Sequence, residues 1–215
     1  MFVSDFTDSV ASGPVHSYSS ISFLQVFNLT LARLFYSAIF YLLIPFVLLR
    51  LLKRSLKEPG YRAGILERFG FFRSKNPGKL VWIHAVSAGE TIAAAPLVQS
   101  LLGQGYVCLV TNMTPTGRER VKALLADEVE NCFVPYDLPG SINRFLRNNE
   151  PRMLITIDTE LWPNMIEGCA RRGVPALLAN GRLSSRSAKG YRRVKWLSGP
   201  MLRSLSLLAV QTSQH

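Results

Sequence analysis

Cysteine, histidine and acidic residues are all scarce in this chain of 215 residues, which has 3 Cys, 3 His and 14 Asp+Glu. The cysteines stand singly, with no C-x-x-C spacing and no nearby pair of histidines. Such a pattern supports neither a zinc site nor a disulfide framework. We therefore predict no metal site, and reduced cysteines that pack inside a cytosolic domain: Cys108, Cys132 and Cys169.

The shortage of acidic residues leaves 25 Lys+Arg in clear excess and a formal net charge of +11. The excess lies mainly in residues 50–75 and in the segment from Arg171 to the end, which has no acidic residue. A basic surplus of this kind favours nucleic acid, anionic lipid or a phosphorylated substrate as the partner. Stacking on nucleic acid requires aromatic side chains, and the basic run 182–195 contains only Tyr191. We expect no nucleic acid partner.

The first 28 residues also lack Lys and Arg, so they have no charged n-region of a signal peptide. They are rich in Ser, and we predict a disordered extension over residues 1–28.

An uncharged apolar run follows, from Leu34 to Leu49 between Arg33 and Arg50. With its neighbours it approaches the roughly 20 residues that span the hydrocarbon of a bilayer. A cluster of basic residues comes next, and the positive-inside rule then places the rest of the chain in the cytoplasm. We predict a membrane-anchor helix over residues 29–54. Because Pro45 interrupts the run, spanning and interfacial placements both remain open, and a buried helix is the alternative.

Short apolar runs recur through the rest of the chain, each followed by turn residues and an amphipathic segment. This alternation is typical of β-α units on a parallel sheet that is buried on both faces. We therefore predict an α/β fold for residues 55–215, with strands in KLVWIHAV, YVCLVTN, NCFVPYD, RMLITID, VPALLAN and SLSLLAVQT.

Polar residues follow these runs, and ligands of doubly wound sheets bind outside the carboxyl ends of the strands. Each residue has a structural alternative, such as helix capping for Glu90, Thr114 or Thr116 and a turn for Asp137. Together they favour one ligand-binding cleft. The set comprises His84, Ser87, Gly89, Glu90, Thr114, Thr116, Arg118, Tyr136, Asp137, Asp158, Thr159, Glu160, Trp162, Asn180, Gly181 and Arg182.

Five motifs stand at the ends of these runs, namely HAVSAGE, TNMTPTGRERV, VPYDLPGSINRFL, DTELWPN and ANGRLSSRSAKGY. In this order they resemble the amino-terminal half of the Kdo transferases, which attach 3-deoxy-D-manno-octulosonic acid (Kdo) to lipid A precursor. The resemblance covers Leu31 to about Thr212.

The resemblance implies the Rossmann-like amino-terminal domain of a GT-B glycosyltransferase at the cytoplasmic face of the bacterial inner membrane. The first domain would bind the lipid acceptor and a second would bind the donor CMP-Kdo, with no other cofactor. We expect residues 55–215 to be the acceptor-binding domain, with the donor domain absent from this truncated chain, which would be inactive alone. A non-catalytic, membrane-anchored module that binds lipid A precursor is the alternative.

Site roles also follow from the resemblance. Glu90 matches the general base, and Asp158 matches an acid that stabilises the transition state, although the family's motif has the longer Glu there. Glu160 occupies the second acidic position of that motif, where helix capping is the alternative. The predicted substrate-binding residues are Ser87, Gly89, Thr114, Thr116, Arg118, Glu160, Arg182, Ser184, Arg186 and Lys189, the last four as a site for the acceptor phosphates.

Overall fold

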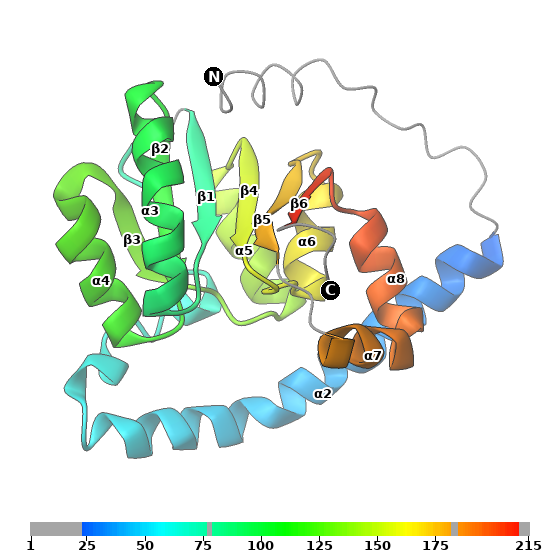
Figure 1. Cartoon of the computed structure of the whole chain (residues 1–215). Helices are drawn as coiled ribbons and strands as arrows, with labels where there is room; N and C mark the ends of the chain where they lie inside the picture. The colour runs from blue at the N-terminus through cyan, green and yellow to red at the C-terminus, as the bar shows by residue number, and fades with distance from the viewer. Residues whose placement is uncertain (1–22, 77–78, 182–184, 211–215) are drawn as a thin grey trace.

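A six-stranded parallel sheet forms the centre of the computed structural model, which describes residues 23–76, 79–181 and 185–210 (Figure 1). The strand order is β3-β2-β1-β4-β5-β6, so the order reverses between β1 and β4. This is the doubly wound, Rossmann-like order, and the predicted α/β class is confirmed. The strands are β1 (Leu80–His84), β2 (Val107–Asn112), β3 (Glu130–Phe133), β4 (Met153–Ile157), β5 (Ala176–Gly181) and β6 (Leu207–Val210).

Helices cover both faces of the sheet, which explains why the strands read as continuous apolar runs. Alternate residues of β1 serve opposite faces: Val81 and Ile83 join one core cluster, Leu80 and Trp82 the other. The helices after the strands are α3 (Ala88–Gly103), α4 (Pro115–Leu125), α5 (Pro139–Asn149), α6 (Pro163–Ala170), α7 (Ser185–Arg193) and α8 (Lys195–Arg203), with short 3-10 turns η1 (Pro59–Arg62), η2 (Glu67–Phe69) and η3 (Ala126–Glu128).

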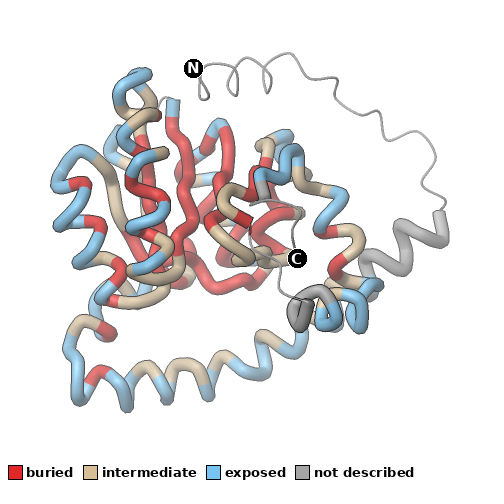
Figure 2. The backbone as a smooth tube through the Cα atoms, in the orientation of Figure 1, coloured by how far each residue is buried: buried red, intermediate tan, exposed pale blue. Residues whose placement is uncertain are grey.

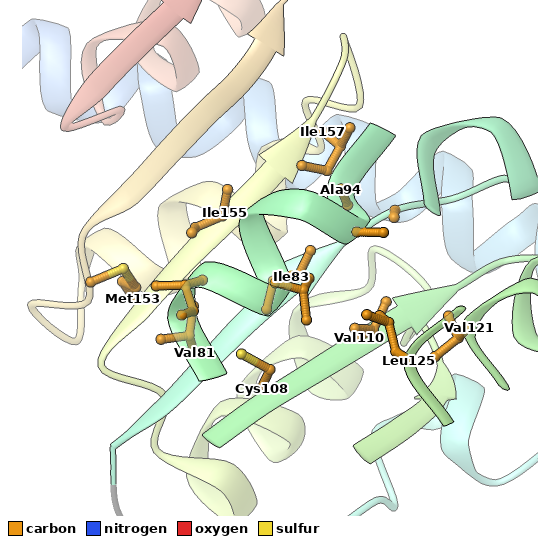
Figure 3. Close-up of a cluster of buried hydrophobic side chains, with 14 of the residues drawn as sticks. Val81, Ile83, Ala94, Cys108, Val110, Val121, Leu125, Met153, Ile155 and Ile157 are labelled. Atoms are coloured by element: carbon orange, nitrogen blue, oxygen red, sulfur yellow. The ribbon is translucent and has the colours of Figure 1, made fainter. Parts of the chain in front are cut away.

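The first core cluster joins the sheet to α3 and α4. Figure 3 shows Ala94 of α3 and Val121 of α4 over side chains of β1, β2 and β4. The second cluster packs α5, α6 and α8 on the other face through residues such as Phe145, Ile166 and Met201. All three cysteines are free and buried, and they belong to these clusters, so their predicted packing role is confirmed.

One long helix, α2 (Phe23–Ser55), precedes the sheet and runs beneath it (Figure 1). Pro45 lies inside this helix without ending it. The helix begins six residues before the predicted boundary at residue 29, so the predicted extension is too long at its carboxyl end. Residues 1–22 lie outside the described part. Figure 2 shows that α2 is largely exposed or half-buried from residue 33 onwards, whereas β1 and β4 are buried.

Candidate functional site

The turn between β1 and α3 holds Glu90 by a reciprocal capping arrangement. Ser87 is the N-cap of α3, and its Oγ accepts a hydrogen bond from the Glu90 N–H at 3.3 Å. In return, Glu90 Oε1 accepts from Ser87 Oγ and Oε2 accepts from the Val86 N–H, both at 2.7 Å. This is a variant of the capping box with Glu at the third helical position, because the carboxylate accepts from the N–H of Val86, one residue before the N-cap, and not from the N–H of Ser87. The small-residue sequence of the turn therefore fixes both oxygens of Glu90.

The electrostatic environment of Glu90 raises its pKa. Burial is the largest cause, and the nearby carboxylates Glu160 and Asp158 add to it, while the bonds from Ser87 and Val86 oppose it. Burial therefore outweighs the local donors at this helix amino terminus. A raised pKa makes the ionised carboxylate a stronger base, which suits general base catalysis.

The second acidic group follows β4. Asp158 has a φ of 61°, in the left-handed region that Asp and Asn tolerate better than most residues, and its N–H donates to Ala179 O at 3.0 Å. Because β1 and β4 are neighbours, Glu90 and Asp158 follow the two strands between which the order reverses. Ligands of doubly wound sheets bind at such a switch point.

Glu160 is fixed by an indole ring. Its Oε2 accepts a hydrogen bond from Trp162 Nε1 at 2.9 Å. The Trp162 ring in turn meets His84 edge-on, with ring centroids 4.8 Å apart. His84 is completely buried, and burial lowers its pKa to about 3, so the ring is neutral. We expected His84 in the cleft, but it lies inside the sheet and supports Trp162.

We predicted Asp137 in the ligand-binding cleft, with a turn as its structural alternative, but the structure gives it a capping role. It is buried, and it accepts hydrogen bonds from the N–H groups of Asn164 at 3.1 Å and Met165 at 2.8 Å, in the first turn of α6. It also accepts from Tyr36 Oη of α2 at 2.9 Å. Asp137 thus caps α6, and the alternative capping role for Glu160 is wrong. Burial raises the pKa of Asp137 to about 6, against the effect of these three donors.

The motif after β2 is largely committed to the fold. Thr114 is the N-cap of α4 and accepts from the Gly117 N–H at 3.1 Å. Arg118 pairs with Glu67 at 3.3 Å and donates to Asn131 Oδ1 at 3.0 Å. Thr116 is exposed, although its hydroxyl lies 3.1 Å from that of Thr114. Substrate binding by Thr114, Thr116 and Arg118 stays a prediction, and Thr116 is the member best placed for it.

Gly89 leaves open space beside Glu90. It is exposed, and a Cβ added there would meet only Ser87 Oγ, at 3.9 Å. Packing therefore does not require glycine at this position. The open space gives a ligand access to the turn that holds Glu90.

The basic segment is described in part. Arg182 and Ser184 lie outside the described residues, as does the side chain of Arg186, which belongs to α7. Lys189 of α7 is exposed. Tyr191 of the same helix donates from its hydroxyl to Thr159 O at 3.3 Å, which attaches α7 to the loop of Asp158 and Glu160.

Sequence reasoning missed the supporting contacts of this site. Tyr36, Trp162 and Tyr191 bond to Asp137, Glu160 and Thr159, respectively. Of these three contacts, only the one between Trp162 and Glu160 could have been predicted locally, because the two residues are two positions apart. The other two contacts join segments that are distant in the chain, so no spacing could indicate them.

The fold and site together define a Rossmann-like α/β domain with carboxylates at its switch point. The family model for 3-deoxy-D-manno-octulosonic-acid transferase (kdotransferase) matches residues 63–215. The chain belongs to this family.

Individual relatives agree with the family match. The chain is 42% identical to the 3-deoxy-D-manno-octulosonic acid transferase of Haemophilus influenzae over 184 residues. This match covers 83% of this chain and 43% of that protein. It is 37% identical over 147 residues to the Bordetella pertussis protein of the same name, and that match covers 65% of this chain and 34% of that protein. The chain thus spans about two fifths of these relatives. Among solved structures, a UDP-N-acetylglucosamine 2-epimerase matches at 12% identity and a TM-score of 0.49, over 63% of this chain and 42% of that one.

Proposed function

We propose that this chain is the acceptor-binding half of a glycosyltransferase of the GT-B type. The enzyme transfers Kdo from CMP-Kdo to lipid A precursor in lipopolysaccharide biosynthesis, at the cytoplasmic face of the bacterial inner membrane. The observation that carries the proposal is the fixed, half-buried Glu90 at the switch point, with Asp158 and Glu160 close enough to raise its pKa.

Glu90 acts as the general base in this proposal. An acceptor hydroxyl gives its proton to the Glu90 carboxylate while its oxygen forms a bond to the anomeric carbon of Kdo. The bond from that carbon to CMP breaks, and CMP leaves with the electron pair. The raised pKa helps Glu90 to keep the proton that it takes. Asp158 supplies negative charge close to the reacting centre, where it stabilises positive charge that develops on the sugar.

The basic segment holds the phosphates of the acceptor. Arg182, Ser184, Arg186 and Lys189 provide charge-assisted and hydroxyl donors, which suit phosphate oxygens. The contact between Tyr191 and Thr159 supports this role, since it attaches the basic helix α7 to the acidic loop. Acceptor phosphates on α7 would then lie on the same side of the domain as the reacting hydroxyl.

Donor binding belongs to the part of the relatives that this chain does not match. Holding two reactants in the correct geometry accounts for about 7 to 11 kcal/mol of barrier lowering in favourable cases. Residues 1–215 alone therefore bind the acceptor without transferring Kdo.

Binding and turnover by residues 1–215 in detergent test this division. We expect calorimetric titration to show binding of lipid A precursor, and no heat with CMP-Kdo. With both substrates present, we expect no product. Transfer by these residues alone would place the donor site within them, and absence of acceptor binding would contradict the proposal.

A further inference from the structure

The apolar helix α2 is attached to the α/β domain near both of its ends. Near its start, Arg33 forms an ion pair with Glu167 of α6. At its end, the buried Ser55 accepts from Arg62 Nε at 3.0 Å, which fixes α2 to the η1 turn. A helix that left the domain to cross a bilayer would be attached at one end only.

Between Arg33 and Ser55, one side of α2 faces the domain. Buried or half-buried residues recur at helical spacing, namely Arg33, Tyr36, Ser37, Phe40, Ile44, Val47, Leu48, Leu51 and Ser55. Two of them bond to the carboxyl edge of the sheet: Tyr36 to Asp137 at 2.9 Å, and Ser37 to Asn164 at 3.3 Å. The domain therefore lies beside α2.

The opposite side of α2 is apolar and exposed. Phe35, Leu42, Phe46 and Leu49 follow one another at intervals of three, four or seven residues, and their exposed fractions are 62%, 74%, 70% and 65%. Within residues 33–55, the most apolar window of 18 residues has a mean hydropathy of 2.0, high enough for a membrane span, and 6% of that window is buried. Water is a poor solvent for such a stripe.

A spanning orientation conflicts with these contacts. The helix has 33 residues, or about 50 Å, and the hydrocarbon of a bilayer is about 30 Å thick. If α2 stood across it, Glu167 with its helix α6, and Asp137 with the segment before α5, would enter the hydrocarbon. Ionisable groups and irregular backbone are costly there.

We infer that α2 lies in the plane of the membrane and inserts its exposed apolar stripe into one leaflet of an anionic phospholipid bilayer. Charge complementarity identifies this occupant, because exposed basic residues stand at the carboxyl end of the helix: Arg50, Lys53, Arg54 and Lys57. Such residues are attracted to the anionic surface of a cytoplasmic leaflet.

This orientation turns the carboxyl edge of the sheet towards the lipid. Asp137 and Asn164 contact α2 at that edge, and Glu90 and Asp158 follow strands that end there. A lipid acceptor can then reach Glu90 while its chains stay in the membrane. The inference rests on the membrane association in the proposed function, and it adds the orientation of α2 in the membrane.

Nitroxide labels on the full chain distinguish the two orientations. One nitroxide label at a time is attached to a single cysteine variant: Phe35→Cys, Leu42→Cys or Leu49→Cys. Each labelled protein is bound to vesicles of phosphatidylethanolamine and phosphatidylglycerol. The depth of the label in the bilayer is measured by its collisions with oxygen and with a nickel chelate. The native cysteines are buried, so the unsubstituted chain measures background labelling. The exposed Arg147→Cys provides the reference in water. An in-plane helix places the three labels at one shallow depth, about 5 to 10 Å into the interface. A spanning helix separates the first and last by about 21 Å, which would overturn the inference.

The anionic surface has its own test. Lys53→Glu with Lys57→Glu should weaken binding to these vesicles at least tenfold, whereas Arg147→Glu with Arg152→Glu, the same change of charge at exposed positions away from α2, should not. Equal binding of all three proteins would overturn the role of anionic lipid. Failure of the unsubstituted chain to bind any vesicle would overturn membrane association itself, and with it that part of the proposed function.

Discussion

At the scale of single residues, Glu90 serves the fold and the proposed chemistry with the same two oxygens. Each oxygen accepts one hydrogen bond within the turn, at 2.7 Å. A carboxylate oxygen has a second lone pair, so the capping bonds leave room for an acceptor proton. The capping box therefore orients the proposed base without occupying it fully.

Asp137 gives a pH-dependent prediction. Its pKa is raised from 3.8 to about 6 because burial disfavours the charged form. The folded state therefore holds the proton more tightly than the unfolded state. The stability contributed by the protonated form is complete below pH 3.8 and is lost as the pH rises through about 6. A rise of about two in the pKa corresponds to about 3 kcal/mol in the free energy of unfolding.

Urea unfolding in detergent at several pH values measures this effect against Asp137→Asn, which cannot ionise. We expect the free energy of unfolding of the unsubstituted protein, minus that of the variant, to fall by about 3 kcal/mol between pH 3 and pH 7. The exposed Asp127→Asn should show no such trend. A constant difference for Asp137→Asn would show that Asp137 ionises equally easily in both states.

Several residue roles were predictable from the sequence, and others were not. Ser87, Glu90 and Thr114 occupy helix starts that local spacing identifies, and the structure places them there. The burial of His84 and the contact of Asp137 with Tyr36 depend on tertiary packing, which their positions at the ends of strands do not reveal.

At the scale of elements, the strands were predictable because each is an apolar run bounded by turn residues. The parallel order follows from the β-α alternation, and both agree with the structure. The start of α2 was not predictable to better than a few residues, since the segment before Leu29 offers no clear cap. Its position along the carboxyl edge depends on Arg33, Tyr36 and Ser37, whose partners lie more than 100 residues away.

The basic helix α7 gives a prediction at this scale. In a complete transferase, Lys189→Ala and Arg186→Ala should each raise the KM for lipid A precursor about tenfold or more, the effect of losing a charge-assisted hydrogen bond of roughly 1.5 to 3 kcal/mol. The KM for CMP-Kdo should not change. Steady-state kinetics provide the measurement, with the exposed Lys122→Ala of α4 as the matched control. Unchanged acceptor KM values in both variants would make the segment an ordinary solvated surface.

At the scale of the whole molecule, the proposed lipid-facing and reactive features share one edge of the domain. The apolar stripe of α2, the basic residues that follow it and the carboxylates after β1 and β4 all belong to the carboxyl side of the sheet. The net charge of +11 suits both an anionic membrane and a phosphorylated lipid. An acceptor that is itself a membrane lipid would explain why these features share an edge.

The central claim is that Glu90 takes the acceptor proton and does more than cap α3. The most direct measurement compares Glu90→Gln with Ser87→Ala in a complete transferase, by the kcat for Kdo transfer and by thermal unfolding. Both variants disturb the same capping box and should lose similar stability, about 1 kcal/mol. Glu90→Gln should lower kcat at least ~100-fold, while Ser87→Ala should keep most of it. If Glu90→Gln transferred Kdo at a rate close to that of Ser87→Ala, Glu90 would be a structural cap and the account of the site would be wrong.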